Sequence, residues 1–277
     1  MNIAISGISG FLGSHLAAFF SNENQVTGIS TSNLPKDFPV YNFQQLDLMA
    51  IPDVVIHSHA AVVSGNAVLN NELLFKGNVA ATEILVNAFP NAKHLYISSV
   101  SVYGNQEKTA TENTPASPVS NYAISKFWGE KIVLQAEKSN VIRLSSLYGN
   151  GMKEGTLLPN YVSQALEKQQ IEVWGDGSRT QNYIHVSDVV AAIAAMIEKD
   201  EWQQQVYLGV SDKEHSNIEM ARLISDPAKA TIVFKNTDLS PSVSYDNRLT
   251  KEKLGWEPKI QIPTAIQSYI EWKKRPY

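Results

Sequence analysis

The chain of 277 residues contains no cysteine. Disulfide bonds, thiolate catalysis and zinc sites with cysteine ligands are therefore excluded, and a reducing compartment is compatible with the composition. No stretch approaches the roughly 18 apolar residues of a membrane-spanning helix. The N-terminal "MNIAISGISG" lacks the basic region and the long apolar core of a signal peptide. We therefore expect a cytoplasmic protein with no membrane partner.

An excess of charge of one sign is also missing. The chain has 23 Lys and Arg residues against 27 Asp and Glu residues, which gives a net charge of -4, so no nucleic-acid partner is expected. Hydrophobic residues make up 43% and charged residues 18%, as in ordinary globular proteins. The histidines do not form a cluster, and His57 and His59, which lie in one expected strand, are expected to be core or channel residues. No metal site is predicted.

The sequence does have a regular alternation of short apolar runs and amphipathic segments. The apolar runs, which predict strands, cover residues 2–6, 25–30, 53–62, 94–104 and 140–149, and the expected helices between them cover residues 11–22, 78–89 and 121–137. Strands that alternate with helices of this length indicate β-α-β units. The predicted fold class is therefore α/β, with a doubly wound parallel sheet.

The pattern changes after Gly149. We expect a Gly-rich loop that ends at Pro159, a helix over 160–168, and two extended pieces on either side of a Gly-Asp-Gly turn. A further helix is expected to follow Ser187, which is a suitable N-cap residue.

Three glycines, Gly7, Gly10 and Gly13, follow the first expected strand in "GISGFLG". Glycines permit a tight turn and let a pyrophosphate approach the backbone, and the N-terminus of the next helix offers N–H groups and a partial positive charge. The spacing differs from the Gly-x-Gly-x-x-Gly pattern. Its location at the start of the alternating pattern nevertheless predicts a dinucleotide-binding loop.

The second expected strand ends in "GISTSN", where an NAD site usually carries a carboxylate that holds the ribose hydroxyls. Ser30 occupies that place, and Lys36 follows it closely. Without the carboxylate a 2′-phosphate is not repelled, and hydroxyl groups together with Lys36 can receive it. Alternatively, Ser30 hydrogen-bonds the ribose of NAD. The predicted cofactor is therefore NAD or NADP, with NADP slightly favoured.

Tyr122 and Lys126 stand four residues apart in "SNYAISKFWGE". On a helix this spacing places both side chains on one face. An ammonium near a phenol favours the phenolate and lowers the tyrosine pKa from about 10. A tyrosine tuned in this way can act as a general acid or base near neutral pH. Such pairs also occur in helices without any function, so the pair alone leaves a purely structural interpretation open.

The same chain carries further motifs in a fixed order: "GISGFLGSHL", Asp47 in "LDL", Ala60 and Ala61, "NVAAT" from Asn78, "YISSVSVYG", Tyr122-x-x-x-Lys126, "VIRLSSLYG", "GDGSRTQNYIHVSDV" and "LGWEP". In this order they resemble the extended short-chain dehydrogenase/reductase family, the NAD(P)-dependent nucleotide-sugar epimerases, dehydratases and reductases. The resemblance implies a Rossmann domain over 1–148, to which 182–210 return. It also implies a smaller substrate-binding domain formed by 149–181 and 211–277.

The resemblance also implies roles for individual residues. Ser99, Tyr122 and Lys126 match the family's catalytic Ser/Thr, its acid/base and the lysine partner. The expected cofactor residues are Gly7, Gly10, Phe11, Leu12 and Gly13 in the pyrophosphate loop, Ser30 at the ribose, Asp47 and Leu48 at the adenine, Ala60, Ala61 and Ser98 along the channel, Asn78 beside it, and Tyr122 and Lys126. The expected substrate residues are Ser101, Ser146, Arg179 and Gln181.

The implied substrate is a nucleotide sugar, and the expected reaction is hydride transfer at C4 of its hexose, as in a 4-epimerase or a 4-keto-6-deoxyhexose reductase. Tyr122 would exchange the proton, Ser99 would hold the same oxygen, and Lys126 would supply the field. The alternative is a non-catalytic cofactor sensor or scaffold on the same fold. Such proteins usually lose the Ser, the Tyr or the Lys, and this chain has all three.

Two departures from the family pattern narrow this expectation. Val100 and Ser101 replace the Asp-Glu pair that removes water in the family's dehydratases, which argues against 4,6-dehydration. Gln181 replaces an Arg that clamps a diphosphate in many members, and Arg179 lies two residues earlier. A substrate without a diphosphate therefore stays open.

Two expected helices, over 70–89 and 121–138, carry wide apolar faces. These faces include Leu73, Leu74, Phe75, Phe127, Trp128 and Val133. One face of a sheet does not obviously absorb so many apolar side chains. Members of the family commonly dimerise through these two helices, so a homodimer is expected.

Overall fold

Seven parallel strands form the central sheet of the computed structural model, which describes residues 1–31, 38–62 and 70–275. The strands follow the order β10-β6-β5-β4-β1-β2-β3. Their bounds are β1 (Asn2–Ser6), β2 (Gln25–Ile29), β3 (Val40–Tyr41), β4 (Val54–His57), β5 (Lys93–Ser99), β6 (Ser139–Leu144) and β10 (Gln205–Gly209). Each neighbouring pair is parallel. The predicted α/β fold class with a doubly wound parallel sheet is confirmed.

Successive side chains of the central strands enter two different cores. In β1, Ile3 and Ile5 join one core cluster, whereas Ala4 joins another. In β5, Leu95 belongs to the first cluster and Tyr96 to a third. Because side chains alternate between the faces of a strand, a strand covered on both faces is apolar at nearly every position. This explains why these strands appear in the sequence as continuous apolar runs.

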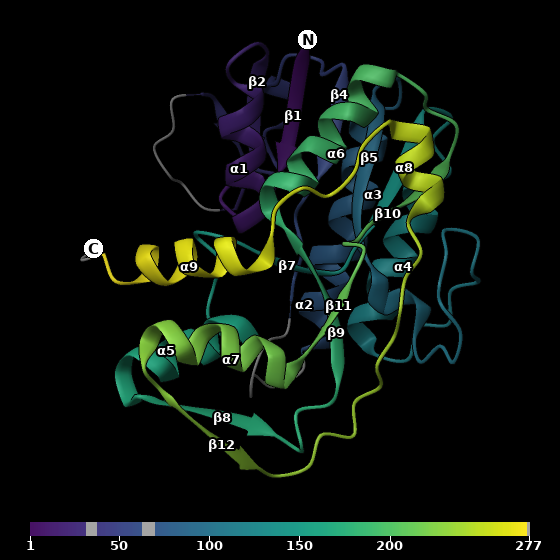
Figure 1. Ribbon diagram of the computed structural model, residues 1–277. Coiled ribbons are helices and arrows are strands. Elements are labelled where there is room, and N and C mark those ends of the chain that lie inside the picture. Colours follow the sequence, from purple (N-terminus) through teal and green to yellow (C-terminus); the bar gives the residue numbers. More distant parts are fainter. Residues whose placement is uncertain (32–37, 63–69, 276–277) are drawn as a thin grey trace.

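Helices cover both faces of the sheet (Figure 1). On one face lie α1 (Phe11–Phe20) and α6 (Val186–Lys199), and on the other lie α3 (Ala81–Ala88) and α4 (Asn121–Val133). A short helix α2 (Asn71–Leu74) continues into α3 through a π-helical segment, η2 (Phe75–Ala80). Between β3 and β4 the chain forms only the 3-10 turn η1 (Leu46–Leu48).

A second group of elements lies below the central sheet in Figure 1. Helices α5 (Leu157–Lys168), α7 (Asn217–Ala228) and α9 (Ile262–Lys273) share one core with β8 (Gln170–Trp174), and β8 pairs with β12 (Thr231–Lys235). A three-stranded sheet contains β7 (Ser146–Tyr148), β9 (Thr180–His185) and β11 (Glu214–Ser216). Helix α8 (Arg248–Leu254) packs against α6 and β10.

Several boundaries differ from the expected ones. The apolar run 140–149 forms two strands, because β6 pairs within the central sheet and β7 pairs with β9. The two extended pieces beside the Gly-Asp-Gly turn are β8 and β9, which join different sheets. The N-cap of α6 is His185, whose Nδ1 accepts from the Ser187 N–H, so the expected Ser187 cap is wrong. An imidazole nitrogen here replaces the usual hydroxyl acceptor.

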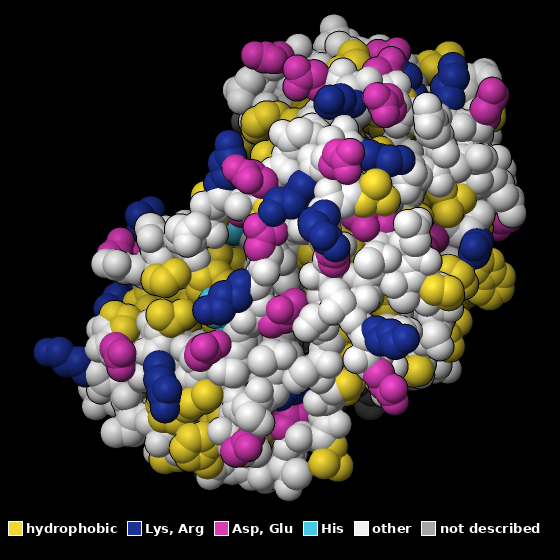
Figure 2. All heavy atoms as spheres, turned by 45° about the vertical axis from the view of Figure 1, so that its right-hand side comes forward, with side chains coloured by type: hydrophobic (Ala, Val, Ile, Leu, Met, Phe, Trp, Pro, Cys, Tyr) yellow, Lys and Arg dark blue, Asp and Glu magenta, His cyan; other side chains and the backbone are white. Residues whose placement is uncertain are grey.

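Charged side chains of both signs are interspersed over the face drawn in Figure 2, as the near balance of acidic and basic residues predicts. None of the helices in the described ranges combines the length and the apolarity that a bilayer-spanning segment needs.

A buried ion pair joins α4 to the central sheet. Arg143 of β6 donates from Nε and Nη2 to the two carboxylate oxygens of Glu130, at 2.9 and 2.7 Å. Their side chains are 6% and 1% exposed. The guanidinium also lies 4.7 Å from the ring centre of Tyr103, which ends the 3-10 segment η3 (Val100–Tyr103) after β5. This pair fixes the position of α4 over β5 and β6.

Removal of one partner of this pair should be strongly destabilising. Arg143→Met leaves the Glu130 carboxylate buried without its partner, and we expect a loss of about 3–5 kcal/mol in the free energy of unfolding. The deficit should shrink as the pH falls from 8 to 5, because an unpaired buried carboxylate has a raised pKa and takes up a proton. Urea denaturation at several pH values measures both effects.

The exposed pair of Glu72 and Lys76, with side chains 71% and 69% exposed, offers a matched control. Lys76→Met should change the free energy of unfolding by less than about 1 kcal/mol. An equal loss of unfolding free energy in both variants would show that the buried pair contributes no more to stability than the exposed pair.

Candidate active site

A cavity of about 1010 Å³ opens where β1, β4 and β5 end. The carboxyl ends of parallel strands are the usual place for ligands in open α/β sheets. The predicted site residues that line it are Gly7, Gly10, Phe11, Leu12, Ser30, Ala60, Ala61, Ser98, Ser99, Tyr122 and Lys126. Those that do not line it are Gly13, Asp47, Leu48, Asn78, Ser101, Ser146, Arg179 and Gln181. The structure therefore brings the expected catalytic residues and most of the expected cofactor residues to one cavity.

The glycine loop between β1 and α1 allows two close backbone approaches. Gly7 has φ +68°, and a Cβ there would lie 2.6 Å from the Cα of His59. A Cβ at Gly13 would lie 2.2 Å from the carbonyl oxygen of Gly7. Gly13 therefore shapes the turn from behind the cavity wall. No side chain caps the first turn of α1 at Gly10, which leaves the start of the helix facing the cavity for an anionic group.

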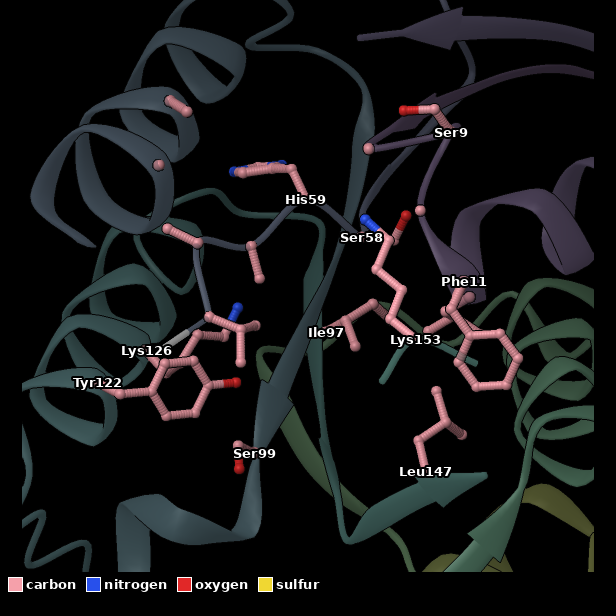
Figure 3. A pocket seen from close by; sticks show the side chains of 18 of the residues that line it. Ser9, Phe11, Ser58, His59, Ile97, Ser99, Tyr122, Lys126, Leu147 and Lys153 are labelled. Carbon is pink, nitrogen blue, oxygen red and sulfur yellow. The ribbon is translucent and has the colours of Figure 1, made fainter. Parts of the chain in front are cut away.

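Tyr122 and Lys126 reach the cavity from α4, and Ser99 reaches it from the end of β5. The helix starts at Asn121, where Ser120 acts as N-cap and accepts a hydrogen bond from the Ala123 N–H. Figure 3 shows Tyr122, Lys126 and Ser99 on one side of the cavity and Ser9 with Phe11 on the opposite side. The hydroxyl groups of Tyr122 and Ser99 interact. A proton-exchanging phenol, a hydroxyl and an amine thus converge on one space.

The protonation of this group differs from the sequence-based expectation. Burial raises the pKa of Tyr122 to about 12, and its hydrogen bond with Ser99 only partly opposes that rise. Burial lowers the pKa of Lys126 to about 7, although the negative charge of Glu130 acts in the opposite direction. The expected lowering of the Tyr122 pKa by Lys126 is therefore wrong for the free protein. Desolvation outweighs the attraction, because both groups lie in a buried place.

Asn78 acts on the cavity from behind its wall. Its side-chain oxygen accepts from the Ala61 N–H at 2.7 Å, and its amide donates to the Ala61 carbonyl at 3.0 Å and to Ser125 Oγ at 2.9 Å. A Cβ at the neighbouring Gly77 would lie 2.9 Å from the Ala61 Cβ. The Asn78 side chain of the π-helical segment η2 therefore binds the backbone of the chain that follows β4. Such π-helical turns are frequent at functional sites.

His59 is a cavity residue that the sequence pattern left undecided between core and channel. Its Nδ1 lies 2.6 Å from Ser6 Oγ and its Nε2 lies 3.2 Å from Thr82 Oγ1. Burial and the nearby positive charge of Lys126 lower its pKa to about 3, so it is a neutral imidazole at physiological pH. His57 lies deeper, fully buried, and its Nε2 contacts His94 Nδ1 at 2.9 Å. The described ranges contain no group of three metal-ligating side chains.

Several expected residues lie outside the cavity lining. Asp47 and Leu48 are exposed in η1, and Leu48 is 64% exposed. Ser146 is exposed at the start of β7, whereas its neighbour Ser145 lines the cavity. The hydroxyl of Ser101 is buried and has no hydrogen-bond partner among the described residues. Successive residues of an extended chain point in opposite directions. Ser145 faces the cavity, and the next residue, Ser146, therefore faces away from it.

Arg179 and Gln181 belong to a polar network beside β9. Gln181 Nε2 donates to Asn217 Oδ1 at 3.0 Å, and Asn217 Nδ2 donates to Asp238 Oδ2 at 3.3 Å. Arg179 Nη1 lies 3.7 Å from the same Asp238 oxygen, and within the described part of the chain its buried Nε has no hydrogen-bond partner. The Arg179 guanidinium is thus only partly engaged. Gln181 lies in β9 and Arg179 directly precedes that strand, and the contacts with Asn217 and Asp238 link the two side chains.

Lys153 was missed by the sequence reasoning. Figure 3 shows its side chain extending into the cavity between Phe11 and Ile97, toward Ser58. It comes from the Gly-rich loop between β7 and α5, where Gly149, Gly151 and Gly155 all have positive φ values. The clustered glycines predicted a loop. Which residues of that loop face the cavity depends on how the three-stranded sheet is placed.

The expected 2′-phosphate site is described only in part. Ser30 and Thr31 line the cavity, and Ser30 Oγ lies 3.1 Å from Ser9 Oγ. Ser32, Asn33 and Lys36 lie outside the described residues.

The model of the NAD dependent epimerase/dehydratase family matches residues 3–209, which is well over half of the chain. A putative UDP-glucose 4-epimerase of Methanocaldococcus jannaschii is 24% identical over 307 residues, with 98% of each chain covered. These matches span both groups of elements described above.

Solved structures show the same fold. The structure of MoeE5 in complex with UDP-glucuronic acid and NAD superposes with a TM-score of 0.90 at 21% identity, and 99% of each chain is covered. The UDP-glucuronic acid 4-epimerase of Bacillus cereus, in complex with UDP-glucuronic acid and NAD, gives a TM-score of 0.88 at 20% identity, with 98% of this chain and 99% of that chain covered.

Proposed function

The chain belongs to the NAD dependent epimerase/dehydratase family, and we propose that it transfers hydride at C4 of the hexose of a nucleotide sugar. The family is one of NAD-dependent enzymes acting on nucleotide sugars. The observation that carries the proposal is the convergence of Ser99, Tyr122 and Lys126 on a cavity that is also lined by the glycine loop. A non-catalytic sensor would not need these three side chains together.

The three residues suit an alcohol-to-ketone conversion. In the oxidation of a sugar hydroxyl, the Tyr122 oxygen takes the hydroxyl proton, and in the reverse step it returns the proton to the carbonyl oxygen. Ser99 donates to or accepts from the same sugar oxygen. Lys126, when charged, favours the phenolate of Tyr122. In the free protein Tyr122 is a neutral phenol, so it starts as a proton donor.

The residues present fit a dinucleotide. The glycine loop and the uncapped start of α1 suit the pyrophosphate, and Ser30 with Thr31 would lie at the adenosine ribose. Ser98 lines the cavity, and its buried hydroxyl has no hydrogen-bond partner in the ranges that the structure describes, so it is available to a polar group of the cofactor. When bound, NAD⁺ supplies the hydride acceptor, and the positive charge of its ring favours the Tyr122 phenolate.

The cavity argues against a dehydratase. Removal of water from the sugar needs an acid near the leaving hydroxyl. Val100 and Ser101 follow Ser99, and among the described lining residues Glu154 is the one carboxylate. Glu154 pairs with Lys273 and accepts from Ser163 Oγ. This supports oxidation and reduction at C4 rather than elimination.

The substrate is proposed to carry a nucleoside diphosphate, as in the UDP-sugar complexes of the structural neighbours. Arg179 is the side chain we assign to its phosphates, because its guanidinium is only partly engaged and it belongs to the same polar network as Gln181. We also propose that Ser101, Ser146 and Gln181 belong to the part of the site that binds the substrate.

Two forms of the reaction fit this site. A 4-epimerase recycles its bound NAD, whereas a 4-keto-6-deoxyhexose reductase releases the oxidised cofactor. Ser30 in place of a carboxylate favours a site that also accepts NADP. The two reactions are distinguished by measuring nicotinamide absorbance in the purified protein and by following NADPH consumption with a 4-keto sugar nucleotide.

We propose the cytoplasm as the site of the reaction, with which the cysteine-free sequence is compatible.

A homodimer is proposed from an apolar surface on η2 and α4. Phe75, Ile124 and Trp128 are 47%, 46% and 51% exposed, and the rings of Phe75 and Trp128 contact each other at 5.7 Å between centres. Leu73 and Ile84 are also about half exposed, but they line the cavity. Leu74 and Val133, which the sequence pattern also assigned to these apolar faces, are buried in the core. The remaining exposed set spans two adjacent helical segments, as a self-complementary interface requires.

Loss of the Tyr122 hydroxyl should nearly abolish turnover. Tyr122→Phe removes the proton-exchanging group, and we expect a fall of about two to four decades in kcat, with cofactor affinity unchanged within a few-fold by calorimetry. Tyr207→Phe makes the same change in β10, away from the cavity lining, and should leave the rate intact. Full activity of Tyr122→Phe on the true substrate would refute the mechanism.

A carboxylate at position 30 should shift the cofactor preference toward NAD. The unmodified chain should bind NADP at least as well as NAD, whereas Ser30→Asp should strengthen NAD and weaken NADP. A carboxylate accepts from ribose hydroxyls and repels a 2′-phosphate, and each contact contributes about 1.5–3 kcal/mol. Calorimetric titration of both cofactors measures this. Ser268→Asp adds the same charge on the exposed face of α9 and should change neither affinity.

Charges on the apolar surface should dissociate the dimer. We expect a dimeric mass for the unmodified chain at micromolar concentration, measured by size exclusion with light scattering, and a monomeric mass for Phe75→Glu combined with Trp128→Glu. Burying two carboxylates at the interface is unfavourable. Ile51→Glu changes an apolar side chain that is 78% exposed outside these helices, and it should stay dimeric. A monomeric unmodified chain contradicts the proposal.

A further inference from the structure

The ammonium group of Lys126 lies over the face of an aromatic ring. Lys126 is 2% exposed, and a charged group in such a place loses most of its hydration. Its Nζ lies 4.2 Å from the ring centre of Tyr96, which comes from β5. The face of an aromatic ring carries negative potential and attracts a cation at this distance. The contact is strengthened by burial, because little water competes for the charge.

The Tyr96 ring is held in a slot that fits it closely. Tyr96 is fully buried, and its hydroxyl lies 3.4 Å from the Asn78 carbonyl oxygen, to which it donates. On the other side stands Gly129 of α4, one turn after Lys126. A Cβ at Gly129 would lie 2.1 Å from the Tyr96 hydroxyl oxygen. Gly129 therefore lets α4 approach β5 closely enough for the lysine to lie over the ring.

We propose that Tyr96 is a positioning residue for the reaction: its ring face holds Lys126 in its charged form and at a fixed place in the cavity. The inference rests on the proposed function of Lys126. Tyr96 is not among the described residues that line the cavity, so its effect on the reaction would pass through the lysine.

Other charged and titratable groups surround the same ammonium. Tyr122 and Glu130 lie on α4 itself, and Glu130 is engaged by Arg143 of β6. From β4 and the residue pair after it come His57 and His59, both of which are neutral because burial lowers their pKa. Burial drives the pKa of Lys126 down to about 7, and Glu130 opposes this. The ring face supplies a second opposing attraction, which can be changed without altering any of these charges.

Fluorination of the ring tests this directly. Phenylalanine, 4-fluorophenylalanine and 3,4,5-trifluorophenylalanine are placed at position 96 by nonsense suppression. They differ little in size, but successive fluorines weaken the negative potential of the ring face. The Lys126 titration is followed by NMR of its side chain in the cofactor-free protein, with the resonance assigned from its loss in Lys126→Arg.

We expect the pKa of Lys126 to fall along this series, by about one unit from phenylalanine to the trifluorinated ring. Tyr96→Phe, which keeps the ring and loses the hydroxyl, should titrate close to the unmodified protein. Tyr96→Leu, which removes the ring, should titrate at least as low as the trifluorinated variant. Equal titration of Lys126 along the fluorinated series would overturn the proposal, whether or not Tyr96→Leu folds.

The pH dependence of kcat/KM provides the second readout. A downward shift of one unit leaves about a tenth of Lys126 charged at pH 7 instead of about half, so the activity should fall several-fold at pH 7 and recover at lower pH. A purely structural role for Tyr96 would lower activity equally at all pH values. The titration does not depend on turnover. If it shifts along the series while the protein has no activity on any nucleotide sugar, the positioning stands and the proposed function fails.

Discussion

The active site depends on keeping the side-chain amine of Lys126 buried beside the carboxyl ends of the central strands. Lys126 is almost completely buried, and desolvation of a lone cation is costly. Three features of the fold compensate for that cost. The ring of Tyr96 faces the charge, Glu130 lies one turn along the same helix, and the cavity provides a polar space in front of the amine. Glu130 in turn accepts two hydrogen bonds from Arg143. The site is thus held by a chain of charges that runs from α4 into β6.

Close backbone approach is the second requirement of the site. Gly7 lies against His59, Gly77 against Ala61, and Gly129 against Tyr96, and in each case a Cβ would come within 3 Å of the neighbour. These contacts bring the chain after β1, the chain after β4 and helix α4 to one cavity. Asn78 adds a two-point hydrogen bond to the Ala61 backbone. The same residues that shape the walls therefore leave room for a ligand in front of them.

The family of this chain is established, whereas its substrate is a proposal. The fold and the family follow from matches over most of the chain, whereas the same fold supports several reactions. What distinguishes this chain lies in a few side chains around the cavity. Gln181 of β9 and Arg179, which directly precedes that strand, share a network with Asp238, and Val100 and Ser101 follow Ser99 where an acid pair would serve elimination. The proposal of a redox reaction at C4 rests on these positions.

Much of the architecture was determined by the sequence itself. Continuous apolar strands between amphipathic helices specify a doubly wound parallel sheet, because only strands covered on both faces lack polar alternation. The Tyr122–Lys126 spacing likewise predicted that both side chains share one face of a helix, and both line the cavity, as do Gly7 and Gly10 of the glycine loop. Local geometry could not decide the protonation states. A four-residue spacing predicts attraction between Tyr122 and Lys126, but their pKa values follow from burial, which is set by β5 and the segments packed around α4. The choice of Ser145 over Ser146, the entry of Lys153 into the cavity and the contact of Tyr96 with Lys126 were decided by tertiary structure, because each depends on how elements distant in the sequence are placed against one another.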